Sequence, residues 1–203
     1  MNVSPLISDA QGEELVSLAR KAVTEFLKNA TIIDVPEASD LKAGVFVTLN
    51  YVTSKREEHL RGCIGFALPE KALSRSVVEA AIAAATADPR FPPVDLPELP
   101  NITFEVSVLT PPVELIGGRS QIRRTINIGK DGLILRWKHG SGLLLPQVPV
   151  ELKWTVDEYL ANLCYKAGAA TDVLDDPSTK IFSFEAIVFK ESEPSGKITR
   201  LRF

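Results

Sequence analysis

The sequence predicts an α+β protein in which helices cover a largely antiparallel sheet. Segments with strand character are separated by amphipathic helical segments, but no strict strand-helix-strand rhythm runs through the chain. No glycine-rich phosphate loop follows a predicted strand, so the usual mark of a nucleotide-binding parallel sheet is missing. The 203 residues, 45% of them hydrophobic, suffice for one large domain or two small interlocked ones.

The N-terminal part predicts one helix followed by two paired strands. Apolar residues recur every three to four positions over residues 9–29, and Ser8 and Gln11 have the spacing of a capping box. Residues 44–52 are rich in β-branched and aromatic side chains, which favours a strand. A charged turn then leads to residues 59–65, which we expect to pair antiparallel with that strand.

A second helix and a third strand follow. Pro69 and Glu70 are expected to open the helix, since proline is tolerated in a first turn, and Asp88-Pro89 is expected to end it. Apolar and polar residues then alternate over residues 102–108. This alternation predicts a half-buried strand with one face on the core.

The second half of the chain is richer in glycine and proline between residues 113 and 150. We expect a short basic helix over 119–124 and a β-hairpin that turns near 138–141.

The C-terminal part predicts one more helix and a closing strand. Thr155 and Glu158 have capping-box spacing, and the helix that they begin should end at Gly168. Residues 181–189 read as one mostly apolar strand, and the tail from 191 to 203 is polar.

Composition excludes several classes of protein. A net charge of −3 and a pI near 5.5 argue against a chain whose main work is to coat nucleic acid or a membrane. No apolar run approaches the roughly 20 residues of a membrane helix, and the N-terminus lacks the features of a signal peptide. Two cysteines are too few for a disulfide framework. We therefore expect a soluble cytoplasmic protein.

The segment Leu60-Arg61-Gly62-Cys63-Ile64-Gly65 carries the main chemical candidates, Cys63 and Arg61. On a regular strand, His59, Arg61 and Cys63 share one face, while Leu60 and Ile64 face the core. Arg61 would then be close enough to lower the pKa of the Cys63 thiol. His59, at roughly 13 Å along the strand, would be too far away to act as its base. The alternative is a small buried cysteine that packs beside glycines.

Gly62 and Gly65 have two interpretations that the sequence leaves open. Glycine in a strand can let a second backbone or a ligand approach closely. It can equally mark a β-bulge, which would break the face assignment for Cys63.

The remaining site candidates have weaker support. Glu105 lies on the polar side of its strand and faces either water or a binding cleft. Gln147, Glu151 and Trp154 cluster after the hairpin, where they form a binding wall or lock two parts of the fold together. Lys130 belongs to a basic stretch that is either a solvated face or a site for RNA or another polyanion. The four cysteines and histidines lack metal-ligand spacing, so we expect no metal and no cofactor.

Several motifs, in this order, resemble the AMMECR domain family. They are the hexapeptide 60–65, Asp88-Pro89-Arg90-Phe91, Glu105-Val106-Ser107-Val108-Leu109, the segments 129–133 and 142–148, Trp154, and Cys164-Tyr165-Lys166-Ala167-Gly168. Residues 169–174 depart from the pattern, because relatives often carry an aromatic residue there.

The resemblance implies one AMMECR-like domain built of two subdomains with a cleft between them. We place the larger subdomain at about residues 1–112 plus 151–190, and the smaller, β-rich one at about 113–150. The family's domain often accompanies a Memo-like protein and a radical SAM protein, which implies a shared modification pathway without implying which component performs chemistry.

Two functions from different classes follow. The first is a non-catalytic binding or adaptor module that positions a substrate or a Memo-like partner. The second is an enzyme of the same pathway that uses a reactive Cys63 in the cleft. Because no acid, base and oxyanion donor can be placed together from the sequence, the first is favoured.

Overall fold

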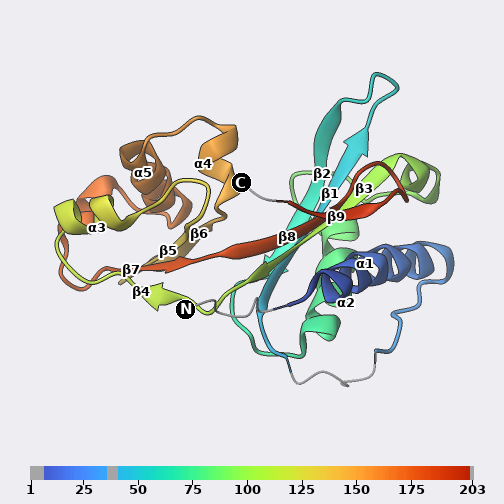
Figure 1. Cartoon of the computed structure of the whole chain (residues 1–203), viewed down its shortest axis with the longest axis horizontal. Coiled ribbons are helices and arrows are strands. Elements are labelled where there is room, and N and C mark those ends of the chain that lie inside the picture. The colour runs from blue at the N-terminus through green and yellow to red at the C-terminus, as the bar shows by residue number, and fades with distance from the viewer. Residues whose placement is uncertain (1–6, 36–40, 202–203) are drawn as a thin grey trace. The chain divides into compact units, whose positions relative to one another are not determined.

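The computed structural model describes residues 7–35 and 41–201 and confirms the α+β class. The chain divides into two compact units. Within the described residues, the first comprises those up to Leu109 together with Ile187–Leu201, and the second comprises Thr110–Ala186. Each unit has its own sheet (Figure 1). Each also has its own hydrophobic core.

The first unit is built on a five-stranded sheet with the order β2-β1-β3-β8-β9. Its strands are β1 Gly44–Val52, β2 Glu58–Phe66, β3 Ile102–Leu109, β8 Ala186–Glu191 and β9 Ile198–Leu201. Strand β1 pairs antiparallel with both β2 and β3, which confirms the predicted hairpin. Helices α1 Asp9–Asn29 and α2 Leu73–Thr86 pack on the core face of this sheet.

Helix α1 forms where its sequence predicts it. The Ser8 side chain accepts from the backbone N–H of Gln11, and the Gln11 side chain accepts from the backbone N–H of Ser8. These reciprocal bonds satisfy amides that the first turn of a helix leaves free.

Within the described residues, no helix has the length and apolar content that a membrane span requires.

Helix α2 begins later than the sequence predicts. Its first residue is Leu73, after a loop that contains Pro69 and Glu70. The Leu73 amide donates to the carbonyl of Leu41, so a tertiary contact fixes the start of the helix. The expectation that Pro69 opens this helix is therefore wrong. A short 3₁₀ helix, η1 Leu96–Asn101, lies between α2 and β3.

Strand β3 is more buried than its alternating pattern predicts. All eight of its residues are buried, including Thr103, Glu105 and Ser107 on the polar side. Alternation reports the chemistry of the two faces of a strand, and it does not report whether the polar face meets water. The predicted half-buried strand is thus correct in position and wrong in exposure.

The second unit has a four-stranded sheet with the order β4-β7-β5-β6. Its elements in chain order are β4 Val113–Glu114, α3 Arg119–Thr125, β5 Gly132–Trp137, β6 Gly140–Leu144, α4 Gln147–Glu151, α5 Val156–Lys166, η2 Thr171–Asp175 and β7 Lys180–Phe184. The basic helix, the hairpin and the capping box on α5 are confirmed. Helix α5 packs on β5 and β6 and supplies much of this unit's core.

The predicted strand over residues 181–189 is two strands that belong to different sheets. Strand β7 pairs with β5, whereas β8 joins the sheet of the first unit. The break lies at Glu185, whose amide donates to the Thr110 hydroxyl and whose carbonyl accepts from the Thr110 amide. An apolar run shows no boundary when each half of it is buried in a different core.

The observed division differs from the predicted subdomain boundaries. Residues 151–186 fall in the second unit because α5 packs on its hairpin and β7 pairs within its sheet. The C-terminal segment is also not merely a polar tail, since Glu191 ends β8 and Ile198–Leu201 forms the edge strand β9.

Candidate functional site

Strand β2 contains a β-bulge at Arg61. Gly62 stands opposite Leu49 and Leu60 stands opposite Asn50, so Arg61 is the extra residue on the β2 side. A bulge reverses the alternation of side chains on its two sides. Of the two interpretations of the glycine-rich segment, the bulge is therefore realised, and the faces assigned to its residues on a regular strand must be revised.

The bulge moves His59 and Leu60 to the faces opposite those expected. Leu60 lies opposite Asn50, on the side of Thr48 and Cys63, and is 42% exposed. His59 lies opposite Tyr51, on the other side of the sheet from Cys63. The predictions that Leu60 faces the core with Ile64 and that His59 shares a face with Cys63 are both wrong. His59 is excluded as a base for Cys63, because the two side chains project from opposite faces of the sheet.

Cys63 belongs to a polar row that crosses three adjacent strands. Its cross-strand partner is Thr48 of β1, and Thr48 is in turn opposite Glu105 of β3. Directly opposed side chains project from the same face of a sheet. The neighbouring row, Ile64, Val47 and Val106, projects into the core on the opposite face. The sheet therefore brings Cys63 and Glu105, two predicted site residues, to one face.

The surroundings of Cys63 oppose ionisation of its thiol. Burial raises the pKa of the thiol, and the charges of Glu105 and Asp88 act in the same direction. The Thr48 hydroxyl, which donates to Sγ over 3.3 Å, and the Arg90 guanidinium lower the pKa by less. The expectation that Arg61 lowers this pKa is wrong, because the net shift is upward and Arg90 is the cation that acts on the thiol.

Asp88 and Arg90 hold the outer edge of β2. Because β2 is the edge strand of its sheet, its outward backbone groups need partners from elsewhere. One carboxylate oxygen of Asp88 accepts from the Cys63 amide over 2.8 Å. The guanidinium of Arg90 donates to both carboxylate oxygens of Asp88 and, over 3.4 Å, to the Cys63 carbonyl. These bonds keep the pKa of the Asp88 carboxyl well below its usual range.

Arg61 fastens the loop that precedes β3. Its guanidinium makes two bonds to the carboxylate of Glu98, over 3.0 and 2.8 Å, and donates to the carbonyls of Pro92 and Pro93. The Arg61 side chain is only 12% exposed, and its two bonds to Glu98 are partly buried. The Arg61 guanidinium lowers the pKa of Glu98. The bulge thus directs Arg61 to a structural ion pair and away from the thiol.

Gly62 also shows the close approach that the sequence left as the other interpretation. A Cβ placed on Gly62 would lie 2.1 Å from the carbonyl oxygen of Ala84, so the backbone of α2 passes directly over this residue. At Gly65 a Cβ would meet the Val45 carbonyl and the ring of Phe46. Both glycines are therefore required for packing in the first unit.

The three site candidates of the second unit lie on different elements. Lys130 is exposed and pairs with Glu185 over 3.3 Å. Gln147 begins α4, is buried, and has no hydrogen-bond partner for Oε1 among the described residues. Trp154 is partly buried against the core of this unit, with its ring 6.5 Å from that of Tyr159.

The remaining cysteine and histidine have structural surroundings. Cys164 is fully buried on α5, as its apolar stripe predicts, and burial raises the pKa of its thiol. The ring of His139 meets the ring of Trp137 edge to face at 4.9 Å. Among residues 7–35 and 41–201, no group of three or more metal-ligating side chains is gathered.

Carboxylates offset much of the basic stretch. Arg119 pairs with Asp175, Arg123 with Asp157, and Lys130 with Glu185. Arg136 lies over the ring of Phe182. Paired cations on a surface attract a polyanion less strongly than free ones, so this arrangement favours a solvated face.

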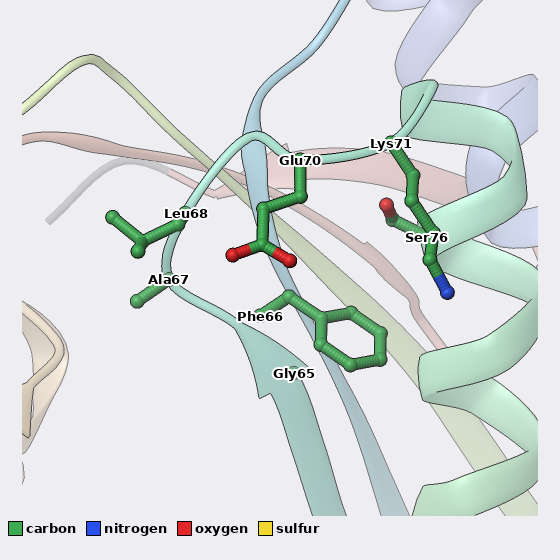
Figure 2. Close-up of a pocket in the computed structure, with 7 residues that line it drawn as sticks. All are labelled: Gly65, Phe66, Ala67, Leu68, Glu70, Lys71 and Ser76. Atoms are coloured by element: carbon green, nitrogen blue, oxygen red, sulfur yellow. The ribbon is translucent and has the colours of Figure 1, made fainter.

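A pocket opens at the end of β2, where the chain leads into helix α2. It has a volume of about 380 Å³ and is lined by Gly65, Phe66, Ala67, Leu68, Glu70, Lys71 and Ser76 (Figure 2). Sequence reasoning missed this site, along with the roles of Thr48 and Asp88. The short spacing of Asp88 and Arg90 was visible in the sequence, but their contact with Cys63 depends on the fold.

Comparison with known proteins places the chain in a family. The AMMECR1 family model matches residues 16–189. A protein of Thermococcus gammatolerans is 48% identical over 198 residues, covering 96% of this chain and 97% of its own. Protein MJ0810 of Methanocaldococcus jannaschii is 46% identical over 197 residues, covering 95% of this chain and 96% of its own.

A solved structure has the same fold. The crystal structure of uncharacterized protein PH0010 from Pyrococcus horikoshii aligns with a TM-score of 0.91 at 46% identity, and the alignment covers 98% of this chain and 100% of that one. Family match, identity and fold agree over nearly the whole length. The chain therefore belongs to the AMMECR1 family.

Proposed function

We propose that this AMMECR1-family chain is a non-catalytic binding module that positions a substrate or a Memo-like partner in a modification pathway with a radical SAM protein. The residues of the hexapeptide that could have carried chemistry are engaged in holding the fold. Arg61 holds the loop before β3 through its ion pair with Glu98, and Gly62 leaves room for the backbone of α2 to pack against β2. The backbone amide of Cys63 donates a hydrogen bond to the Asp88 carboxylate.

The observation that carries this proposal is the state of the Cys63 thiol. A cysteine nucleophile reacts as the thiolate, and enzymes lower its pKa with a nearby base or cation. Here burial dominates and raises the pKa, and two carboxylates oppose ionisation further. A thiol in these surroundings is a poor nucleophile near neutral pH, which favours binding over covalent catalysis.

The polar face of the larger sheet holds buried groups that can bond a small polar group. Thr48, Glu105 and Ser107 project from it, and the buried Ser107 hydroxyl has no hydrogen-bond partner among the described residues. A buried polar atom without a partner is unfavourable unless a water or a ligand group satisfies it. This face therefore supports binding of a polar group without requiring a reaction.

Co-purification with a Memo-like protein from the same cell tests the proposal. The wild-type chain and Cys63→Ser are each tagged and isolated at low salt, and the partner is quantified by mass spectrometry. We expect both chains to retain the partner to the same extent. Repeated isolation without any partner would contradict the adaptor role.

The same samples test the alternative enzyme. The intact mass of the co-purified partner is compared between the two chains. A modification that forms with the wild type and is lost with Cys63→Ser, while the complex persists, would establish the thiol enzyme in place of the binding module.

A further inference from the structure

The pocket at the end of β2 has the dimensions of a small-molecule site. Its volume of about 380 Å³ lies in the range of roughly 300–1,000 Å³ that ligand pockets occupy. Strand β2 contributes Phe66, the following loop contributes Leu68, Glu70 and Lys71, and helix α2 contributes Ser76. All of these residues belong to the first unit.

One carboxylate of the pocket has no paired cation among the described residues. Glu70 forms no ion pair or side-chain hydrogen bond with another described residue, although it lies next to Lys71 in the chain. Figure 2 shows its carboxylate directed toward the region of the Phe66 ring. A protonated amine is the group that would complement this charge beside an aromatic ring.

The cation of the pocket, Lys71, shares its carboxylate partner with a second cation. Lys71 donates to Glu79 over 2.5 Å, and Arg75 donates to the same carboxylate over 3.0 Å. Two cations therefore depend on one anion, which leaves one excess positive charge at this end of the pocket. Exposed ion pairs of this kind are worth about 0–1 kcal/mol, so Lys71 can turn to a ligand carboxylate at little cost.

An apolar surface adjoins the two charges. The ring of Phe66 lies with its centroid 6.0 Å from the Lys71 ammonium, and Figure 2 shows the Glu70 carboxylate and the Lys71 ammonium above this ring, to its left and right. Phe66 is 37% exposed and Leu68 is 44% exposed. A ligand that reaches both charges would lay an apolar group on this surface and remove it from water.

From this arrangement we propose that the pocket binds a small zwitterion of the α-amino acid class with an apolar side chain. Its ammonium contacts Glu70, its carboxylate contacts Lys71 and the Ser76 hydroxyl, and its side chain lies on Phe66 and Leu68. The inference goes beyond the partner-binding proposal, because it concerns a separate ligand and is tested without any partner protein.

Three probes that share a phenyl group and differ in the charged groups that they carry test the inference by isothermal titration calorimetry on the full chain. They are L-phenylalanine, phenethylamine with the amine alone, and 3-phenylpropionate with the carboxylate alone. We expect L-phenylalanine to bind about two- to fivefold more tightly than either half, since each exposed charge pair contributes modestly to affinity.

Two variants assign the charges separately. Glu70→Gln should weaken binding of L-phenylalanine and phenethylamine and leave the affinity for 3-phenylpropionate unchanged. Lys71→Met should weaken binding of L-phenylalanine and 3-phenylpropionate and leave the affinity for phenethylamine unchanged. Glu57→Gln and Lys55→Met, in the exposed turn between β1 and β2, serve as matched charge controls and should change nothing. Equal affinity for the three probes, no binding up to their solubility limits, or equal losses in the two pocket variants would overturn the inference.

Discussion

Replacement of Gly62 by alanine tests whether the glycines of the hexapeptide serve the fold. The new Cβ would lie 2.1 Å from the carbonyl oxygen of Ala84 and 3.0 Å from its carbonyl carbon. Both are backbone atoms, so no side-chain rotation can relieve the overlap. Either β2 or α2 must move by roughly 1 Å or more, away from a core packed at native density.

The expected cost follows from two opposing effects. Overpacking of a well-packed core lowers the free energy of unfolding by about 1–3 kcal/mol. Replacing glycine by alanine reduces the entropy of the unfolded chain and returns about 0.4–1 kcal/mol. We therefore expect Gly62→Ala to be destabilised by about 1–2 kcal/mol or more.

Urea denaturation followed by far-UV circular dichroism measures this loss. With a slope of about 2 kcal/mol per molar urea, the midpoint should fall by roughly 0.5–1 M. Gly118→Ala is the matched control, because a Cβ there meets nothing within 4 Å. Both tryptophans, Trp137 and Trp154, lie in the second unit, so their fluorescence follows that unit separately. Equal midpoints for the two alanine variants would refute the packing role of Gly62.

Three further changes test the bonds around the hexapeptide. Asp88→Asn should lower the free energy of unfolding by about 2–3 kcal/mol at neutral pH, since charge-assisted bonds to Arg90 are lost. The folded-state pKa of Asp88 is lowered, so its contribution is complete above about pH 3.9 and is lost as the pH falls through the folded value. The difference from wild type in urea midpoint should therefore shrink in acid, and a constant difference down to pH 2 would contradict the assigned ion pair. Arg61→Lys should cost about 1–3 kcal/mol by the same assay, because an ammonium cannot reproduce the forked contact with Glu98; an unchanged midpoint would argue against that contact. Ser107→Ala should leave stability unchanged or raise it by up to about 1 kcal/mol, because the buried hydroxyl has no partner among the described residues, and a clear loss of stability would reveal one.

Local features of the fold follow from the sequence. The bounds of α1, the capping boxes at Ser8 and Thr155, and the β5–β6 hairpin depend on residues a few positions apart. Caps and turns are decided by such neighbours. These elements were therefore predicted at nearly the correct positions.

Features that depend on distant residues could not be predicted in the same way. The amide of Cys63 meets Asp88, 25 positions along the chain, and Arg61 meets Glu98, 37 positions along. The sequence showed the glycines but left open whether they form a bulge or admit a second backbone, and the structure shows both at adjacent residues. The break at Glu185 was missed because both halves of the run are apolar.

The candidate site was predicted in part. The sequence singled out Cys63 and Glu105, and the sheet register brings them into one row through Thr48, which carried no signal of its own. Arg61 was placed beside the thiol on the assumption of a regular strand. The bulge removes that assumption, and with it the argument for an activated cysteine.

Titration of the Cys63 thiol tests the central claim most directly. A Cys164→Ala chain leaves one thiol, whose rate of alkylation by iodoacetamide is measured from pH 6 to 10.5 in folded protein, with a Cys63→Ser, Cys164→Ala chain as the blank. We expect slow alkylation with a midpoint above the ordinary thiol pKa of about 8.5. Because the Thr48 hydroxyl lowers this pKa, Thr48→Val should move the midpoint higher still. Fast alkylation with a midpoint clearly below 8.5 would contradict the structural thiol and favour the enzyme.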